Sequence, residues 1–338
     1  MHNKFIVLTK ADKPVAVLTG STNFTESALY GQLNCAHVVV GAATAQTYFD
    51  FWNQICSDPE IAALREYTAK ETPNPPHPLP PGVTAVFSPR SGLSLLSDYG
   101  ALAGGADNAL FMTFAFGVDD VFVASYLKAD GVLRFALMDK EASGRGAAKG
   151  RQNVAKMRKV PNTVLAVGQN IPLNEFDRWL KEKAGLPESK FVKWVHTKFM
   201  LIDPLSDDPT VVAGSANFSK ASTESNHENM ILVRGNTRVA DIYLGEFMRQ
   251  FSSYAFRDAA ASAAKGDQET AANWRPQDLA PDDSWVGNYF QNGTSRTLRR
   301  VYFSGGEEPA GASGGRVHDG ADKNHDHPAR RKAGARHA

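Results

Sequence analysis

The sequence predicts an α/β fold made of two related halves with a mixed sheet flanked by helices, on two observations. The first is a pattern of His, Lys, Gly, Ser and Asn that occurs twice at one spacing: His2, Lys4, Gly20, Ser21 and Asn23, and then His196, Lys198, Gly214, Ser215 and Asn217. The second is the alternation of short apolar runs with amphipathic stretches, which is typical of strands alternating with helices.

The second copy of the pattern follows a long series of expected elements. We expect strands or short apolar runs at 83–87, 109–116, 133–138, 163–167, 191–203, 210–213 and 230–233, and helices at 91–103, 173–184 and 238–254. The runs are rich in apolar and β-branched residues, whereas the helical segments carry apolar residues at a period near 3.6.

The first copy begins at residue 2, so a counterpart of residues 83–195 is missing from its half. After this copy we expect a strand at 36–40 and helices at 43–55 and 60–69, which matches the order that follows the second copy. We therefore expect a first half truncated at its N-terminal side, with the strand around residues 2–8 at a sheet edge or with apolar Phe5 and Val7 facing solvent.

Composition divides the chain further. Residues 72–81 contain six prolines, which predicts a stiff linker. After residue 304 large apolar residues almost vanish, which predicts a disordered tail. The expected divisions are a partial first half (1–70), a linker (71–81), a second half (82–257), a C-terminal extension (258–303) and the tail (304–338).

The repeated residues suit the chemistry of a phosphodiester. On a strand, His and Lys two residues apart point to the same face, and the Gly-Ser-x-Asn turn after the next strand adds small polar groups. Cations and amides such as Lys4, Lys198, Asn23 and Asn217 can surround anionic oxygens. Two facing imidazoles, His2 and His196, can supply a nucleophile and a proton donor for an in-line displacement.

His-x-Lys, an acid five residues after the Lys, and Gly-Ser-x-Asn together resemble the catalytic signature of the phospholipase D superfamily, most closely its bacterial two-motif members. The second copy matches throughout, with Asp203 as the acid, whereas the first has Thr9 at that position. The resemblance covers about residues 2–70 and 82–257. It implies phosphodiester cleavage through a phosphohistidine, with no metal and no other cofactor, and with Asp203 in a structural role.

The partners of the two histidines are open at this stage. Glu228 stands 32 residues after His196 and can accept a hydrogen bond from it, while Asn34 stands 32 residues after His2. Because a charged partner raises the basicity of an imidazole more than a neutral one, His196 is then the better candidate for the nucleophile. The resemblance instead favours the N-terminal histidine, His2, as the nucleophile. Ser21, Ser215, Asp203, Glu228 and Asn34 are therefore supporting candidates.

Residues 140–159 carry seven Lys or Arg against one Glu. We interpret this segment as a solvated flexible loop, with a phosphate- or head-group-gathering lip over the site as the alternative. The net charge of +1 argues against a surface that is basic throughout, so any contact with a polyanion is local.

Several functions stay open. A phospholipid is the expected substrate, because two motifs in one chain favour lipid, and transient contact with a membrane surface is then expected. A nuclease acting on nucleic acid, a phosphatidyl transferase and a non-catalytic phosphate-binding remnant are the alternatives. No apolar stretch long enough for a membrane span and no signal peptide is visible, which favours a bacterial cytoplasmic or peripheral membrane location. The sequence does not predict the oligomeric state.

Overall fold

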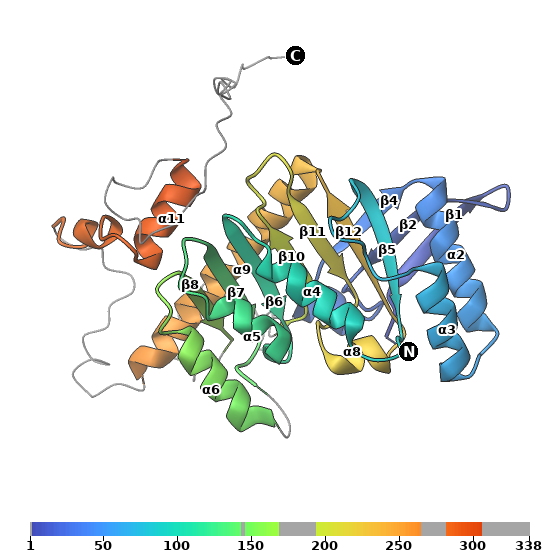
Figure 1. The fold of residues 1–338 in the computed structure, drawn as a ribbon, viewed down its shortest axis with the longest axis horizontal. Coiled ribbons are helices and arrows are strands. Elements are labelled where there is room, and N and C mark those ends of the chain that lie inside the picture. Colours follow the sequence, from blue (N-terminus) through green and yellow to red (C-terminus); the bar gives the residue numbers. More distant parts are fainter. Residues whose placement is uncertain (1, 143–145, 169–193, 265–281, 306–338) are drawn as a thin grey trace, which may run out of the picture.

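The computed structural model describes residues 2–142, 146–168, 194–264 and 282–305. It contains a seven-stranded mixed sheet, a three-stranded antiparallel sheet and a short two-stranded parallel pair, with helices around them (Figure 1). The α/β fold with a mixed sheet predicted from the sequence is confirmed.

The strands are β1 (Phe5–Lys10), β2 (Lys13–Gly20), β3 (Gln32–Leu33), β4 (Ala36–Val40), β5 (Gly82–Ser88), β6 (Ala109–Phe114), β7 (Leu133–Met138), β8 (Thr163–Val167), β9 (Trp194–Val195), β10 (Phe199–Ile202), β11 (Thr210–Gly214) and β12 (Glu228–Arg234). The helices are α1 (Glu26–Gly31), α2 (Ala42–Cys56), α3 (Ile61–Glu71), α4 (Ser94–Gly104), α5 (Asp120–Tyr126), α6 (Ala147–Met157), α8 (Lys220–Glu224), α9 (Thr237–Ala264), η3 (Val286–Tyr289) and α11 (Ser295–Ser304).

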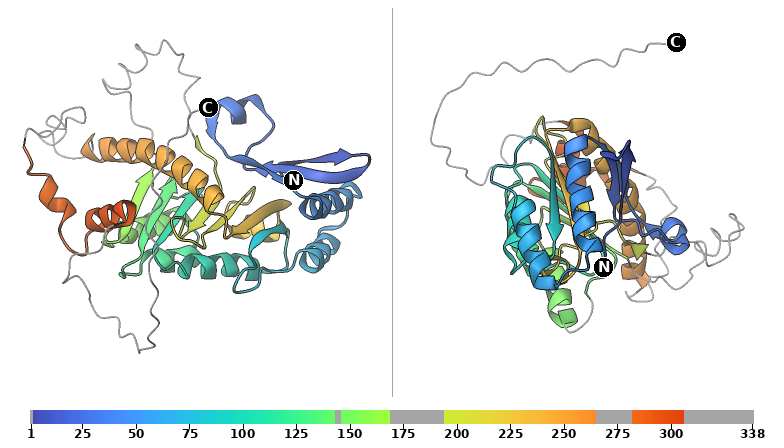
Figure 2. Two further views of the ribbon diagram at one scale, coloured as in Figure 1. Left: turned by 90° about the horizontal axis from the view of Figure 1, so that it is seen from above. Right: turned by 90° about the vertical axis from the view of Figure 1, so that its right-hand side faces the viewer.

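The large sheet has the order β5-β12-β11-β10-β6-β7-β8, with β6, β7 and β8 parallel and the other pairs antiparallel. Its central strands are buried on both faces, which explains why β6, β7 and β10 are almost continuously apolar. One face packs against α9 and the other against α4 and α5 (Figure 2).

The small sheet, β1-β2-β4, repeats part of the large one. Adding 194 to a residue number in the first copy gives its counterpart in the second, as for His2 and His196. The strand register repeats as well: Phe5 pairs with Thr19 as Phe199 pairs with Ala213. β1, β2 and β4 therefore correspond to β10, β11 and β12, and α2 corresponds to the start of α9.

Aromatic side chains join the two sheets. Phe51 of α2 stacks on Phe87 of β5 with ring centroids 4.1 Å apart, and Tyr48 meets Phe87 edge-on at 4.9 Å. Phe5 of β1 packs against Tyr48 at 5.1 Å. These buried rings make α2 a shared part of the core, and they hold β1 close to the large sheet.

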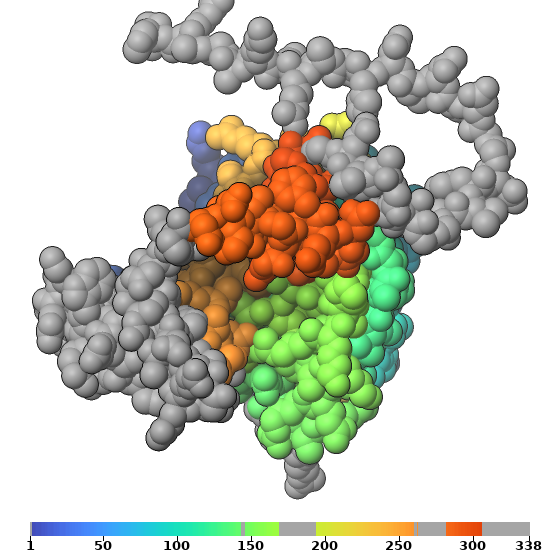
Figure 3. Space-filling view, turned by 90° about the vertical axis from the view of Figure 1, so that its left-hand side faces the viewer, coloured from blue at the N-terminus to red at the C-terminus, as the bar shows by residue number. Residues whose placement is uncertain are grey.

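The C-terminal helix α11 covers another end of the core. Leu298 is buried, and the Phe303 ring lies 6.4 Å from the ring of Phe135 in β7. Figure 3 shows this segment in red against the green surface of α6 and its neighbours. The predicted extension thus contributes a helix to the core.

The structure differs from the sequence predictions in two of its helices. The interpretation of residues 140–159 as a flexible loop is wrong, because α6 occupies much of the segment and buries Val154 and Met157. The helix expected at 238–254 is longer than predicted, since α9 runs to Ala264. The helix expected at 173–184 and the tail after residue 305 lie outside the described residues.

The outer face of the small sheet is apolar and exposed. Ile6, Leu8 and Val38 are 53%, 60% and 58% exposed. The expectation that Phe5 and Val7 face solvent is wrong, because that side of β1 packs against the core. Met200, Ile202 and Leu232, the counterparts of the three exposed residues, are 9% exposed or less, because they belong to the core beneath α4 and α5. The described part of the chain places no such layer over the small sheet, and β1 lies at its edge.

We expect this face to drive self-association, because an open apolar sheet edge recruits other chains. Light scattering after size-exclusion chromatography should show apparent mass rising with concentration. Ile6→Lys with Val38→Lys should weaken that rise while leaving the circular dichroism unchanged. Gln46→Lys, on the exposed side of α2, is the matched control. A wild-type chain that stays monomeric at every concentration contradicts the expectation.

Candidate active site

Each motif histidine lies just before the first strand of its copy, β1 or β10, and is held by the backbone of the other copy. The His2 N–H donates to the His227 carbonyl (3.2 Å), and the His196 N–H donates to the Leu33 carbonyl (3.0 Å). Because 33 and 227 are counterparts, the two contacts are equivalent. They bring the imidazoles together, with ring centroids 6.4 Å apart.

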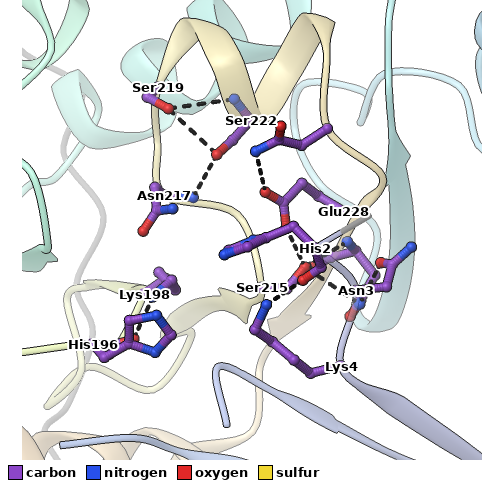
Figure 4. Close-up of polar contacts among 12 residues, drawn as sticks. His2, Asn3, Lys4, His196, Lys198, Ser215, Asn217, Ser219, Ser222 and Glu228 are labelled. Carbon is purple, nitrogen blue, oxygen red and sulfur yellow. Dashed lines mark hydrogen bonds and ion pairs between the residues drawn. The ribbon is translucent and has the colours of Figure 1, made fainter. Parts of the chain in front are cut away.

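The side-chain partners follow the same crosswise pattern. His2 Nδ1 lies 2.8 Å from Glu228 Oε2, and His196 Nδ1 lies 2.8 Å from Asn34 Oδ1. Figure 4 shows His2 beside Glu228. The predicted pairing of Glu228 with His196 is therefore wrong. The 32-residue spacing identifies the right residue types but not the right copy, because each strand end reaches across to the other half.

The Gly-Ser of each motif closes against the strand that carries this partner. A Cβ on Gly20 would come within 2.1 Å of the Cys35 carbonyl oxygen, and one on Gly214 within 2.2 Å of the Asn229 carbonyl oxygen. Only glycine allows this approach. It lets Ser215 Oγ donate to Glu228 Oε2 (2.6 Å) and Ser21 Oγ donate to Asn34 Oδ1 (3.0 Å).

The two lysines are buried cations. Lys198 Nζ donates to the His196 carbonyl (2.6 Å), and Lys4 Nζ donates to the His2 carbonyl. Burial, followed by the charge of Lys4, lowers the pKa of Lys198 to about 7. Burial lowers the pKa of Lys4 to about 8, against the opposing effect of Glu228. An anion placed between the two ammonium groups would stabilise both in their charged form.

Asn217, the motif asparagine of the second copy, lies beside this cluster (Figure 4). The Asn217 N–H donates to Ser222 Oγ (3.1 Å), and its side-chain Oδ1 is buried without a partner among the described residues. Asn23, its counterpart, is half-buried. A cavity of about 260 Å³ reaches Asn217 and is also lined by Asp119, which caps α5, by Asp120 of α5 and by Lys149 of α6.

Asp203 follows the last residue of β10, and its side chain binds backbone N–H groups at the start of β6. Its carboxylate accepts hydrogen bonds from the N–H groups of residues 107, 108 and 109 at 2.7–2.9 Å, which holds the start of β6. The structure describes no counterpart of β6 beside β1, so Thr9 has no such backbone to bind. This accounts for the departure of Thr9 from the repeated pattern.

Sequence reasoning missed Asn229, which follows Glu228 on β12 and is fully buried. Its Oδ1 accepts from Tyr48 (3.1 Å) and from Thr19, and its Nδ2 donates to Asn3 Oδ1 (2.9 Å). These bonds tie β12 to the first copy. The only signal in the sequence is an amide beside an acid at the start of an apolar strand.

Residues 155–251 match the family model described as "Cardiolipin synthase, PLD-like domain". This chain contains a phospholipase D-like domain. Such domains belong to a superfamily of phosphodiesterases and transferases, and the match spans the second motif, from His196 to Glu228. No curated protein matches the chain.

Solved structures similar to the chain include three bacterial proteins. Nuc of Salmonella typhimurium, a phospholipase D family member, is 19% identical, with 51% of this chain and 95% of that one covered and a TM-score of 0.37. NucT of Helicobacter pylori is 14% identical, with 51% of this chain and 97% of that one covered and a TM-score of 0.35. Phosphatidylserine synthase of Haemophilus influenzae is 12% identical, with 74% of this chain and 62% of that one covered and a TM-score of 0.47.

No group of three or more His, Cys, Asp or Glu side chains is placed to hold a metal ion in the part of the chain that the structure describes. Within these residues, no helix is both long and apolar enough to cross a bilayer.

Asp203→Ala should destabilise the fold by about 2–4 kcal/mol, because it leaves the N–H groups at the start of β6 without their charged acceptor. Thr9→Ala, the same change at the counterpart position, should shift stability by less than about 0.5 kcal/mol. Urea unfolding followed by circular dichroism measures both. Equal effects of the two substitutions would refute the structural role of Asp203.

The lysines predict pH-dependent anion binding. Their pKa values lie below the ordinary 10.5, so their cations are present at low pH and are lost as the pH rises through about 7 and 8. Affinity for diethyl phosphate, whose single charge is constant, should therefore fall about tenfold or more between pH 6 and pH 9. Titration by ³¹P NMR measures this, with Lys220→Met as a surface control. An affinity that does not vary with pH would contradict the assignment of these lysines to anion binding.

Proposed function

We propose that the chain hydrolyses a phosphodiester through a phosphohistidine intermediate and that its substrate is a phospholipid. The observation that carries the proposal is the pair of imidazoles with ring centroids 6.4 Å apart, each backed at Nδ1 by a hydrogen-bond acceptor. This separation suits groups acting on opposite sides of one phosphorus.

The surrounding residues are proposed to bind the phosphate. Lys4 and Lys198 supply the positive charge, while Asn23 and Asn217 supply amide donors to its oxygens. We interpret β1-β2-β4 with α2 as one half and the large sheet with α9 as the other, related by a pseudo-twofold axis through this cluster. On this interpretation, fixed cations and imidazoles stabilise the transition state.

Phospholipid is favoured as the substrate by two observations. The matched family model is described by the name of a synthase of cardiolipin, which is itself a phospholipid. In addition, α6 presents Lys149, Arg151 and Lys156 to solvent and borders the cavity that reaches Asn217. We propose that this helix contacts an anionic membrane surface transiently and that a head group occupies the cavity.

A substrate panel tests the proposal: vesicles of phosphatidylcholine or phosphatidylglycerol, single-stranded DNA, and bis(4-nitrophenyl) phosphate. We expect release of the lipid head group, undiminished by EDTA because the stabilising cations are side chains. His196→Ala should reduce turnover about a thousandfold or more, whereas His77→Ala, on the linker, should not.

Other outcomes of the panel have distinct meanings. Preferential cleavage of DNA would show that the chain is a nuclease and not a phospholipid phosphodiesterase. Formation of a phosphatidyl alcohol when ethanol is added would indicate a transferase. Binding without turnover of any compound would leave only a phosphate-binding domain and refute the proposed activity.

A further inference from the structure

One backbone N–H beside the candidate site is held by a side chain from outside both motifs. The strand β9 ends at Val195, just before His196, and among the described residues it pairs with β3 alone. The His196 N–H donates to the Leu33 carbonyl of β3, whereas the Val195 N–H donates to Asp139 Oδ1 (2.9 Å). Because successive N–H groups of a strand point to opposite sides, the Asp139 carboxylate takes the place of a second neighbouring strand.

Asp139 is itself fixed at the end of a central strand. It follows β7, and its N–H donates to the Phe114 carbonyl at the end of β6 (3.0 Å). The backbone of Gly168 packs closely against it, because a Cβ there would come within 2.6 Å of the Asp139 carbonyl oxygen and 2.7 Å of the Tyr254 ring. The carboxylate therefore starts from the buried interior of the large sheet, and its hydrogen bond to β9 fixes the segment that carries His196.

Asp139 also places a negative charge near Lys198. Burial raises the pKa of the Asp139 carboxyl, and the hydrogen bond from Val195 and the charges of Lys140 and Lys198 oppose that effect. Tyr254 of α9 is a further titratable group that faces this carboxyl. The carboxylate is therefore attached to the backbone of the candidate site and acts on one of its two cations.

Lys198 needs such a charge more than Lys4 does. Burial, followed by the charge of Lys4, lowers the pKa of Lys198 to about 7, and the acids that act in the opposite direction are Glu228, Cys35 and Asp139. Glu228 acts on Lys4 as well. Burial raises the pKa of the Cys35 thiol, which keeps it neutral. Asp139 is therefore the carboxylate whose effect distinguishes Lys198 from Lys4.

We propose that Asp139 is a positioning residue of the candidate site with two separable effects. Its oxygen holds the backbone that presents His196, and its charge keeps Lys198 cationic, so that the site binds an anion at neutral pH. The effect on turnover rests on the proposed phosphodiesterase function. The effect on anion binding requires no turnover, so it can be measured whether or not the chain is an enzyme.

Two substitutions separate the effects. Asp139→Asn keeps an oxygen that can accept from the Val195 N–H but removes the charge, whereas Asp139→Ala removes both. Asp241→Asn, on the exposed surface of α9, is the matched control for the loss of one carboxylate. Circular dichroism establishes that each full-length chain is folded. If Asp139→Ala does not fold, Asp139→Asn by itself tests the charge.

The charge is tested by binding of diethyl phosphate, followed by ³¹P NMR between pH 5 and pH 9. Removal of the carboxylate lowers the pKa of Lys198, so this cation is lost at a lower pH. The fall in affinity near pH 7 that belongs to Lys198 should therefore move down by about half a pH unit or more in Asp139→Asn. The fall near pH 8 that belongs to Lys4 should stay in place. His196, whose pKa is lowered to about 3, stays neutral throughout this range.

The oxygen is tested by amide hydrogen exchange and by turnover. Exchange at the Val195 N–H should be about tenfold faster or more in Asp139→Ala, and close to that of the unchanged chain in Asp139→Asn. At pH 6, where Lys198 stays charged, Asp139→Asn should cleave bis(4-nitrophenyl) phosphate at nearly the unchanged rate. Asp139→Ala should be about ten- to a hundredfold slower, because the backbone that presents His196 is no longer fixed.

The outcomes separate this inference from the proposed function. A fall in affinity that does not move in Asp139→Asn, or exchange at Val195 that is unaltered in Asp139→Ala, overturns the assignment of Asp139, even in a chain that cleaves phosphodiesters. A shifted fall and faster exchange in a chain that turns over no substrate of the panel support the assignment and overturn the proposed function. Both changes together with the expected rates support both.

Discussion

Each motif histidine is hydrogen-bonded by residues of the other copy, and the candidate site depends on this constraint. His2 is fixed at its backbone and at Nδ1 by residues 227 and 228, and His196 by residues 33 and 34. Neither copy of the motif can therefore orient its own imidazole. The cluster exists only when the segments just before β1 and β10 meet, so the packing of the two halves against each other also forms the site.

The interface that achieves this combines apolar packing with one buried polar network. Rings of α2 and β5 supply apolar contact, whereas Asn229 joins β12 to Thr19, Tyr48 and Asn3. Apolar packing tolerates small shifts, but a buried amide with several partners does not. We interpret Asn229 as the residue that sets the register between the halves and so holds the imidazoles at one separation.

The repeat shows that equal sequence positions do not have equal environments. Phe24 is 57% exposed, whereas its counterpart Phe218 is buried between Tyr99 and Phe122 of α4 and α5. Asp203 holds three backbone N–H groups, whereas the described residues place no such backbone beside Thr9. In the first pair the difference comes from α4 and α5, which cover the large sheet, and in the second from β6, a strand of that sheet. The repeated residues therefore define the site, while the elements around them determine how each half is stabilised.

The local sequence pattern was sufficient to predict many of the strands and helices. The strands near the motifs, α2, α3 and α4 follow from apolar periodicity, and the candidate residues follow from a spacing that occurs twice. The basic segment at 140–159 was misjudged, because its charges and glycines hide the few apolar residues, Val154 and Met157, that α6 buries.

The pairing of Glu228 with His2 and of Asn34 with His196 was decided by tertiary structure alone. The partners lie 226 and 162 residues apart in the chain, and their contact depends on how two sheets pack rather than on any local spacing. The sequence by itself determined which residues form the cluster, because strand periodicity and the repeat are local properties. Which imidazole receives the carboxylate is a property of the packed molecule, because only the crossing of the two halves brings those atoms together.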